Sequence, residues 1–257
     1  MSARVPLRIV RRGEGAPLVL VHGFAGSGES WADVVRRIPP GRTIATFVLP
    51  GHDPSFSAPP GARFEEMLDA IASNLKDSIE TPCEVAGYSM GGRVVLGLLV
   101  RRPELVSSAI LIGANPGIES DEERTARAAW DESWARLLEE RGIEEFVSRW
   151  EALPIFATQS ALPEEAKRSQ RTIRLAHDPQ ALANALRSLG LAAMPSYWPE
   201  LPRITARVRL VAGERDAKFL PIARRMEKAI PRAETIVVPS TGHNPLVENP
   251  AFLAGIF

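Results

Sequence analysis

One short segment near residue 90 constrains the fold more than any other part of the chain. Residues 83–87 have the apolar pattern of a buried strand, and residues 90–101 have the apolar spacing of a helix. Between them lies Gly-Tyr-Ser-Met-Gly at residues 87–91, which matches the G-x-S-x-G pattern of a sharp strand-to-helix turn. Such a turn exposes its serine, here Ser89, above the carboxyl edge of a sheet, and side chains at the two glycines would collide with backbone. A glycine-rich turn without chemistry is the alternative.

The rest of the chain predicts a mostly parallel central sheet flanked by helices. Further strand patterns occupy residues 17–22, 43–49, 107–113, 206–213 and 234–238, and residues 64–76 have helical spacing. With the serine turn, this order predicts an α/β-hydrolase fold.

The stretch from about residue 115 to residue 198 has no convincing strand pattern. Prolines divide it into helical segments, and Ser120 to Glu123 is a capping pattern for the first of them. Because strands resume afterwards and would complete the same sheet, we interpret the stretch as a helical lid inserted into one domain. The predicted parts are a core over 1–114, the lid over 115–199 and a second part of the core over 200–257. Two separate domains are the alternative.

Composition excludes several classes of partner. The 257 residues include 31 Lys plus Arg and 31 Asp plus Glu, so nothing in the charge favours nucleic acid or an anionic membrane. The apolar run at the N-terminus is too short for a signal peptide, and no stretch approaches the roughly 20 apolar residues of a membrane helix. The single cysteine fits a reducing compartment. We expect a cytoplasmic monomer, and we expect no structural zinc because no Cys/His cluster has metal-ligand spacing.

Two further side chains complete a hypothetical catalytic set with Ser89. Asp216 follows the strand at 206–213, and His243 follows the last strand, so the chain order is serine, acid, histidine. His243 would take the proton of the serine hydroxyl, and Asp216 would fix the tautomer and orientation of the imidazole. Glu214 is a rival acid. Asp216 as a surface turn residue and His243 as a capping residue are the structural alternatives.

Backbone groups are expected to stabilise a developing oxyanion. They are the N–H of Met90, at the start of the helix, and the N–H of Phe24, in the loop after the first predicted strand. The other histidines have structural interpretations. We expect His22 to hold that loop, His52 to stabilise a turn, and His177 in the lid to be exposed to solvent.

Three arginines suggest what the pocket binds. Arg93 lies one helical turn after the serine, and Arg127 shares a helical face with Trp130 and Trp134, which we expect to be packed. Arg174 lies on a later helix of the lid. If these guanidinium groups converge, they form a pocket for a polyanion, because arginine binds carboxylates bidentately. Three separate solvated arginines are the alternative.

Several motifs together resemble a known family. The segments 87–93, 113–117 and 213–219, with Trp150 and the Pro-Ile-Phe at 154–156, are similar to the MenH-type SHCHC synthases of menaquinone biosynthesis. The resemblance covers nearly the whole chain and implies a lyase without a cofactor. Such an enzyme removes pyruvate from 2-succinyl-5-enolpyruvyl-6-hydroxy-3-cyclohexene-1-carboxylate by a 2,5-elimination, using the serine, histidine and acid to move a proton.

The resemblance also implies substrate-binding residues. The carboxylate-binding arginines of the family correspond to Arg93, Arg127 and Arg174, with Arg171 as an alternative to the last. Its pocket tyrosine and tryptophan correspond to Tyr88 and Trp150. Two other functions stay open at this point: a carboxylic ester or C–C bond hydrolase with the same triad, and a non-catalytic ligand-binding protein that kept the fold.

Overall fold

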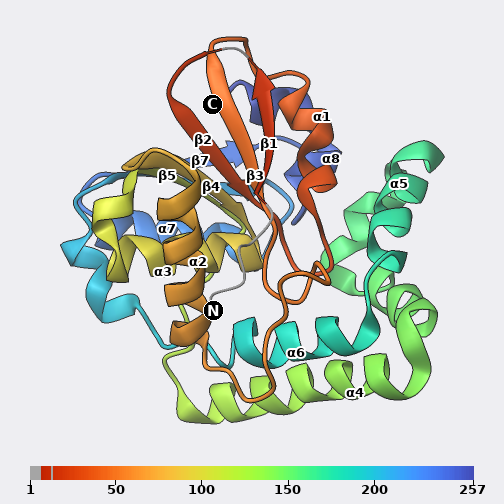
Figure 1. The fold of residues 1–257 in the computed structure, drawn as a ribbon. Helices are drawn as coiled ribbons and strands as arrows, with labels where there is room; N and C mark the ends of the chain where they lie inside the picture. The colour runs from red at the N-terminus through yellow and green to blue at the C-terminus, as the bar shows by residue number, and fades with distance from the viewer. Residues whose placement is uncertain (1–6, 13) are drawn as a thin grey trace.

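A computed structural model describes residues 7–12 and 14–257 of the chain. Its centre is a seven-stranded sheet with the strand order β1-β3-β2-β4-β5-β6-β7 (Figure 1). The strands are β1 (Leu7–Arg12), β2 (Pro17–Val21), β3 (Arg42–Phe47), β4 (Cys83–Tyr88), β5 (Val106–Ile112), β6 (Arg207–Gly213) and β7 (Ala233–Val238). Neighbouring strands are parallel except for the antiparallel pair β1 and β3. The mostly parallel sheet is therefore confirmed.

Strand β1 is the one strand that the apolar patterns did not predict. It lies at the edge of the sheet, where it pairs only with β3. An edge strand does not need the continuous apolar run that marks a strand buried on both faces, so periodicity gives little signal there. Residues 1–6 and 13 of the segment assessed as a signal peptide lie outside the described residues.

Helices cover both faces of the sheet (Figure 1). On one face, α2 (Phe64–Ser78), α3 (Met90–Arg101) and α7 (Phe219–Ala229) pack on a core that includes Val19, Val85 and Leu111. On the other face, α1 (Ala32–Val35), α8 (Pro245–Glu248) and α9 (Pro250–Ala254) pack on Leu18 and Ile110. Alternate residues of each strand thus point to opposite helical layers, as the two-residue period of a strand requires.

The segment between β5 and β6 is helical throughout its regular parts. It contains α4 (Asp121–Glu151), the 3-10 helix η3 (Pro154–Ala161), α5 (Glu164–Leu175), α6 (Pro179–Leu189) and the 3-10 helix η4 (Trp198–Arg203). The Ser120 side chain accepts a hydrogen bond from the N–H of Glu123 at 3.3 Å, which begins α4. Prolines begin η3 and α6 and directly precede α5, since proline is tolerated there and not in a helix interior.

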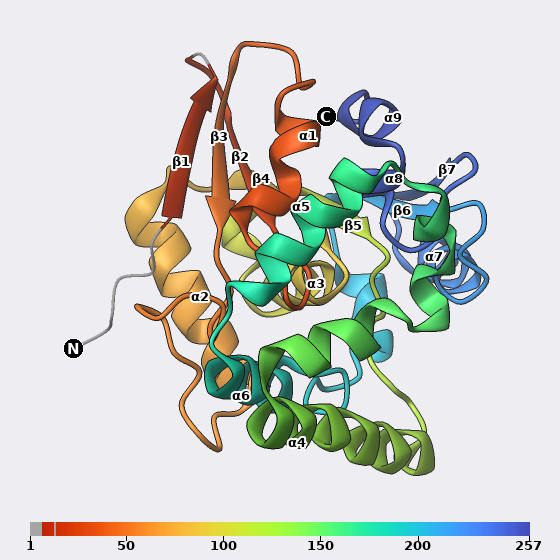
Figure 2. The ribbon, with the colours of Figure 1, turned by 90° about the vertical axis from the view of Figure 1, so that its right-hand side faces the viewer.

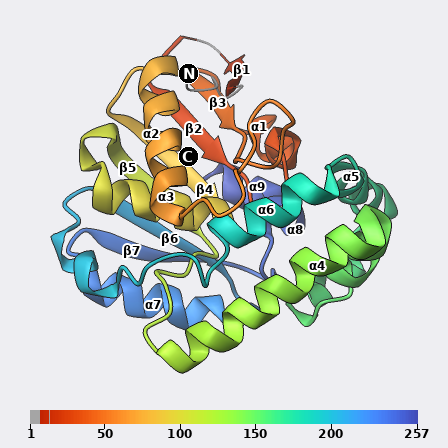
Figure 3. The ribbon, with the colours of Figure 1, turned by 60° about the horizontal axis from the view of Figure 1, so that its bottom comes forward.

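The inserted helices have a small core of their own. Helices α4 and α6 run side by side (Figure 3), and α5 extends towards α1 (Figure 2). Leu138, Phe146, Val147 and Leu182 are fully buried there with Ala25, which comes from the loop after β2. The lid therefore rests directly on that loop. Among the described residues, no helix is long and apolar enough to cross a membrane.

Candidate active site

The turn between β4 and α3 places Ser89 in a strained conformation. Its φ of 51° and ψ of −108° lie in a region that residues other than glycine rarely adopt. A Cβ added at Gly91 would lie 2.4 Å from the carbonyl oxygens of Val21 and His22, and one at Gly87 would lie 2.4 Å from the carbonyl oxygen of Gly91. Both glycines are required because backbone fills the space of a side chain. Strain of this kind, of order 1–3 kcal/mol, is typical of a functional residue.

Ser89, His243 and Asp216 form a continuous hydrogen-bonded relay. The Nε2 atom of His243 lies 3.1 Å from Oγ of Ser89, and its Nδ1 atom lies 2.8 Å from Oδ2 of Asp216. An ionised carboxylate only accepts, so Nδ1 carries the hydrogen and Nε2 is left to accept the hydroxyl proton. His243 and Asp216 are 3% and 5% exposed. Glu214, the rival acid, accepts a bond from the N–H of Ser240 on an exposed loop.

The imidazole of His243 is held between aromatic rings and a close backbone segment. The ring of Phe219 lies 4.4 Å from it between centroids, and that of Tyr88 lies 5.4 Å away. Gly113, at the end of β5, has a φ of 57°, and a Cβ there would lie 2.7 Å from Cε1 of the imidazole. The histidine therefore has little freedom to turn away from the serine.

A cavity of about 670 Å³ opens above Ser89 and His243, and we term it the Ser89 cavity. Arg93 faces it while only 7% exposed, and its Nη1 donates to the carbonyl of Leu189 at 2.8 Å. Burial, and then the nearby positive charge of Arg127, lower the pKa of Arg93 to about 9. A desolvated guanidinium with spare donors is an effective receptor for a carboxylate.

Arg127 also lines the Ser89 cavity, but it has a partner of its own. Its Nε donates to Oδ1 of Asp131 at 2.8 Å, and its Cζ lies 4.5 Å from the ring centroid of Trp130. The expectation that this aromatic face is packed was wrong for Trp130, which is 36% exposed, because α4 borders the open cavity there. Trp134 is partly buried against the core.

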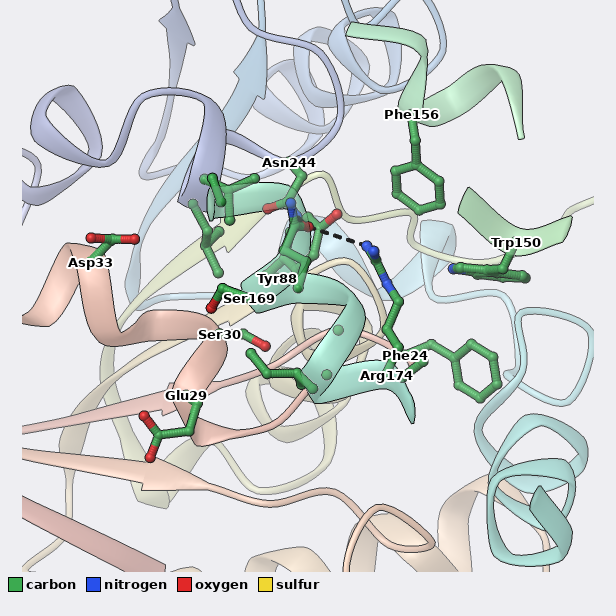
Figure 4. A pocket seen from close by; sticks show the side chains of 18 residues that line it. Phe24, Glu29, Ser30, Asp33, Tyr88, Trp150, Phe156, Ser169, Arg174 and Asn244 are labelled. Atoms are coloured by element: carbon green, nitrogen blue, oxygen red, sulfur yellow. Dashed lines mark hydrogen bonds between the residues drawn. The ribbon is translucent and has the colours of Figure 1, made fainter. Parts of the chain in front are cut away.

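A second, smaller cavity of about 70 Å³ adjoins the first, and we term it the Arg174 cavity (Figure 4). Trp150 and Phe156 line both cavities, whereas Arg174 and Tyr88 line only the smaller one. Figure 4 shows the guanidinium of Arg174 beside the rings of Phe156 and Trp150. The two cavities thus lie on either side of a shared aromatic wall.

Arg174 is tied to neighbouring side chains. Its Nη1 binds Oε1 of Glu151 at 2.8 Å, and its Nη2 donates to Oε1 of Gln170 at 3.2 Å. Arg171, the alternative to it, binds the other oxygen of Glu151 at 2.6 Å. Gln170 also accepts a bond from the side chain of Asn244, the residue after the relay histidine, at 3.3 Å. The cation on α5 is therefore connected, through the side-chain amides of Gln170 and Asn244, to the residue that follows His243.

The two expected oxyanion donors lie at the start of α3 and in the loop after β2. Met90 is the first residue of α3, where a backbone N–H has no acceptor within the helix. Phe24 belongs to the loop of residues 23–26 after β2, and its ring packs 5.3 Å from Trp150 and 6.0 Å from Phe146, both on α4.

The structure brings two further cations to the Ser89 cavity, Arg215 and Lys218. Both residues are exposed overall. The Lys218 ammonium is partly shielded from solvent, and this desolvation, followed by the charge of Arg127, lowers its pKa. The sequence feature that could have identified Lys218 is its position two residues after Asp216, within the 213–219 segment that resembles the synthase family. Within 7–12 and 14–257, no cluster of three or more His, Cys, Asp or Glu side chains could hold a metal ion.

The environment of His177 was predicted wrongly. The side chain is 9% exposed rather than solvated, and its ring lies 5.3 Å from that of His52. It belongs to the turn between α5 and α6, and that turn packs on the core. A polar residue in a helical insertion is exposed by default, and periodicity does not reveal which turn docks.

Comparison with known proteins defines the class first. The family model described as "Alpha/beta hydrolase family" matches residues 18–256. A thermophilic esterase from Thermogutta terrifontis superposes with a TM-score of 0.81 at 22% identity, covering 98% of this chain and 91% of the other. The chain is an enzyme of the α/β-hydrolase fold, and the predicted fold class is confirmed.

More similar proteins define the particular family. A 2-succinyl-6-hydroxy-2,4-cyclohexadiene-1-carboxylate synthase from Enterobacter sp. (strain 638) is 31% identical over 92% of this chain and 88% of its own length. A Bacillus subtilis (strain 168) protein, named provisionally as the same synthase, is 32% identical over 93% of this chain and 88% of its own length. The structure of MenH from S. aureus superposes with a TM-score of 0.91 at 30% identity, covering 97% and 95%. The chain belongs to this synthase family, as its motifs predicted.

Proposed function

We propose that the protein is a carbon–oxygen lyase that eliminates pyruvate from 2-succinyl-5-enolpyruvyl-6-hydroxy-3-cyclohexene-1-carboxylate and forms 2-succinyl-6-hydroxy-2,4-cyclohexadiene-1-carboxylate, a step of menaquinone biosynthesis. Besides membership of the family, one structural observation supports this function. The hydrogen-bonded relay of Ser89, His243 and Asp216 opens onto a cavity lined by the buried guanidinium of Arg93 and by Arg127. A pocket for neutral esters has no need of desolvated cations, whereas a tricarboxylate substrate does.

The reaction follows from the relay. Ser89 removes the proton of ring carbon 2, which is acidified by the succinyl ketone, while His243 takes the hydroxyl proton and Asp216 stabilises the imidazolium. The electron pair of the broken C–H bond moves onto the ketone oxygen as an enolate. The N–H groups of Phe24 and Met90 stabilise this charge, and removal of one such donor typically costs about 100- to 1000-fold in rate.

The second half of the reaction releases pyruvate. The enolate re-forms the ketone as a double bond forms between ring carbons 2 and 3. The double bond between carbons 3 and 4 moves to carbons 4 and 5, and the bond between ring carbon 5 and the enolpyruvyl oxygen breaks. The leaving group departs as the enolate of pyruvate and takes a proton, which His243 can supply. No bond forms between Ser89 and the substrate, so hydroxyl, imidazole and carboxylate return to their starting states.

The two cavities divide the three carboxylates of the substrate. Arg93 and Arg127 serve two of them in the Ser89 cavity, and Arg174 serves the third from the smaller cavity, where it exchanges Glu151 for the ligand. Trp150 lies between the cavities and packs on the ring of the substrate, and Tyr88 closes the smaller one beside His243. Lys218 adds positive charge at the rim.

The same proposal includes the setting expected from the sequence. The enzyme works in the cytoplasm as a monomer on a small-molecule polycarboxylate, without nucleic-acid or membrane partners. The balanced charge and the single, buried cysteine support this setting.

Parallel assays on one preparation test the function. The enolpyruvyl substrate is supplied and pyruvate is followed by coupled oxidation of NADH, with a nitrophenyl ester assayed alongside. The lyase predicts rapid pyruvate release and slow ester turnover. Rapid ester turnover with an acyl group trapped on Ser89, and no pyruvate, would establish the hydrolase instead. Tight binding of the substrate without any product would establish a non-catalytic binding protein.

A further inference from the structure

Three histidine rings form a row between the 23–26 loop and the lid. His22 directly follows β2, His52 lies in the turn after β3, and His177 lies in the turn between α5 and α6. The ring centroids of His22 and His52 are 4.8 Å apart, and those of His52 and His177 are 5.3 Å apart with the planes nearly perpendicular. All three side chains are buried. The reaction as described uses none of them.

His52 binds the backbone of the loop directly. The N–H of Ala25 donates to Nε2 of His52 at 3.1 Å, and Nδ1 of the same ring lies 3.1 Å from the carbonyl oxygen of Pro50. A carbonyl only accepts, so Nδ1 carries the hydrogen and the ring is neutral, with Nε2 as the acceptor. Burial lowers the pKa of His52 well below its ordinary value, which keeps the ring in that form.

The bond from Ala25 lies at the most constrained point of the loop. Ala25 has a φ of 56°, a left-handed conformation that costs a residue with a Cβ about 1–2 kcal/mol. Its N–H belongs to the peptide that follows Phe24, the residue expected to stabilise the enolate. This peptide and the one that carries the Phe24 N–H share the Cα atom of Phe24, so a displacement of one shifts the other. His52, which lines neither cavity, therefore restrains the backbone directly beside the Phe24 N–H.

His177 brings the lid into the same arrangement. Its ring packs against His52. Burial lowers the pKa of His177, and hydrogen bonding to the backbone of Ala25, His52 and Gly26 opposes this effect, so the lid histidine lies directly on the loop that carries Phe24. Phe24 contacts Phe146 and Trp150 of the lid from the other side. The loop is thus supported by the lid at both ends of the Phe24–Ala25 peptide.

We propose that His52 is a positioning residue that sets the direction of the Phe24 N–H through its bond to Ala25, and that His177 makes this support depend on the seated lid. The inference concerns the loop itself. It rests on the proposed function only where the test measures kcat for pyruvate release.

A pair of variants isolates the acceptor. The amide of His52→Gln can place an oxygen where Nε2 lies, whereas the amide of His52→Asn reaches only the position of Nδ1. We expect His52→Asn to lower kcat for pyruvate release about ten- to hundredfold with KM within about twofold, because the lost interaction acts on the transition state. His52→Gln should stay within about threefold of wild type. Equal losses in both variants would overturn the positioning role.

Hydrogen exchange of the peptide that contains residues 23–26 gives a readout independent of catalysis. It should be faster in His52→Asn than in wild type and unchanged in His52→Gln. Ile71→Val, in the core on α2, is the control for mild destabilisation and should change neither kcat nor this exchange. If the wild type releases no pyruvate, the proposed function fails, and the exchange comparison still decides the inference.

The lid contribution is tested by His177→Ala. We expect faster exchange of the same peptide and a fall in kcat of about three- to tenfold, smaller than that of His52→Asn because the acceptor itself remains. Wild-type exchange together with wild-type kcat would show that the lid has no part in positioning the loop.

Discussion

The sheet edge and the lid hold their functional groups in different ways. At the sheet edge, backbone geometry fixes Ser89, and His243 binds the serine hydroxyl with one ring nitrogen and Asp216 with the other. In the lid, Arg127 is bound to Asp131 and Arg174 is bound to Glu151. The relay is therefore already assembled, whereas in the proposed reaction the lid arginines must exchange or share their acidic partners to bind a carboxylate.

The difference has an energetic consequence. Preorganised groups contribute to the transition state without reorganising, so their loss lowers kcat. A guanidinium that leaves one carboxylate for another gains only the difference between the two interactions. The largest effects of substitution should therefore come from the sheet edge and the smallest from Arg174. Intermediate effects should come from Arg93, whose guanidinium forms no ion pair with an acidic side chain in the described part of the chain.

Ser89→Ala is the strongest test of this ranking. We expect kcat for pyruvate release to fall at least about 1000-fold with little change in KM, since the variant loses its base but no binding contact. Ser133→Ala, which removes an exposed hydroxyl on α4 outside both cavities, is the matched control and should keep wild-type kcat. Full pyruvate release by Ser89→Ala would remove the sheet edge from the chemistry.

Arg93→Met should have the next largest effect. Loss of a charge-assisted hydrogen bond costs about 1.5–3 kcal/mol, which corresponds to a rise in KM of roughly 10- to 150-fold. Initial rates over a range of substrate concentrations measure it. Arg101→Met, at the exposed end of the same helix, should leave KM unchanged. An equal rise in both variants would mean that net charge, not the buried position of Arg93, attracts the substrate.

The row of histidines, which joins the two regions, predicts acid sensitivity. Burial lowers the pKa of His22 to about 3, so between that value and 6.5 the unfolded chain binds a proton that the folded chain excludes. The free energy of unfolding should fall as the pH is lowered through this window, by about 1 kcal/mol for each such histidine between pH 7 and pH 5.5. Denaturant unfolding at the two pH values measures the loss. His52→Gln should reduce it, and an unchanged loss would mean that His52 does not contribute.

The same contrast explains what the sequence could predict. The relay was accessible because a strained serine turn requires glycines at fixed positions, and because chain order brings the ends of parallel strands to one edge. The sequence favoured Asp216 over Glu214 by its position in the loop, although both follow the same strand. Only the structure shows that the acid at 216 is buried against the imidazole.

The lid was less predictable for a physical reason. Arg127 and Asp131 are four residues apart on one helix, so their pairing is visible as a spacing. Arg174 and Glu151 are 23 residues apart and meet only because α5 folds back on the end of α4. The buried environment of His177 likewise depends on docking between elements, and a local pattern carries no information about that docking.

Substitutions around Glu151 test the smallest effect predicted by the comparison, that of Arg174 in the lid. Arg174→Gln should raise KM about three- to tenfold, less than Arg93→Met, because the guanidinium exchanges one carboxylate for another. Glu151→Gln should lower KM by about twofold, since it releases Arg174 from its competing partner. Arg171→Gln is the matched control: Arg171 binds the other oxygen of Glu151 but lines neither cavity, so KM should stay within about twofold. A larger effect at Arg171 than at Arg174 would exchange their roles, and a rise in KM for Glu151→Gln would mean that Glu151 orients the arginine rather than competing for it.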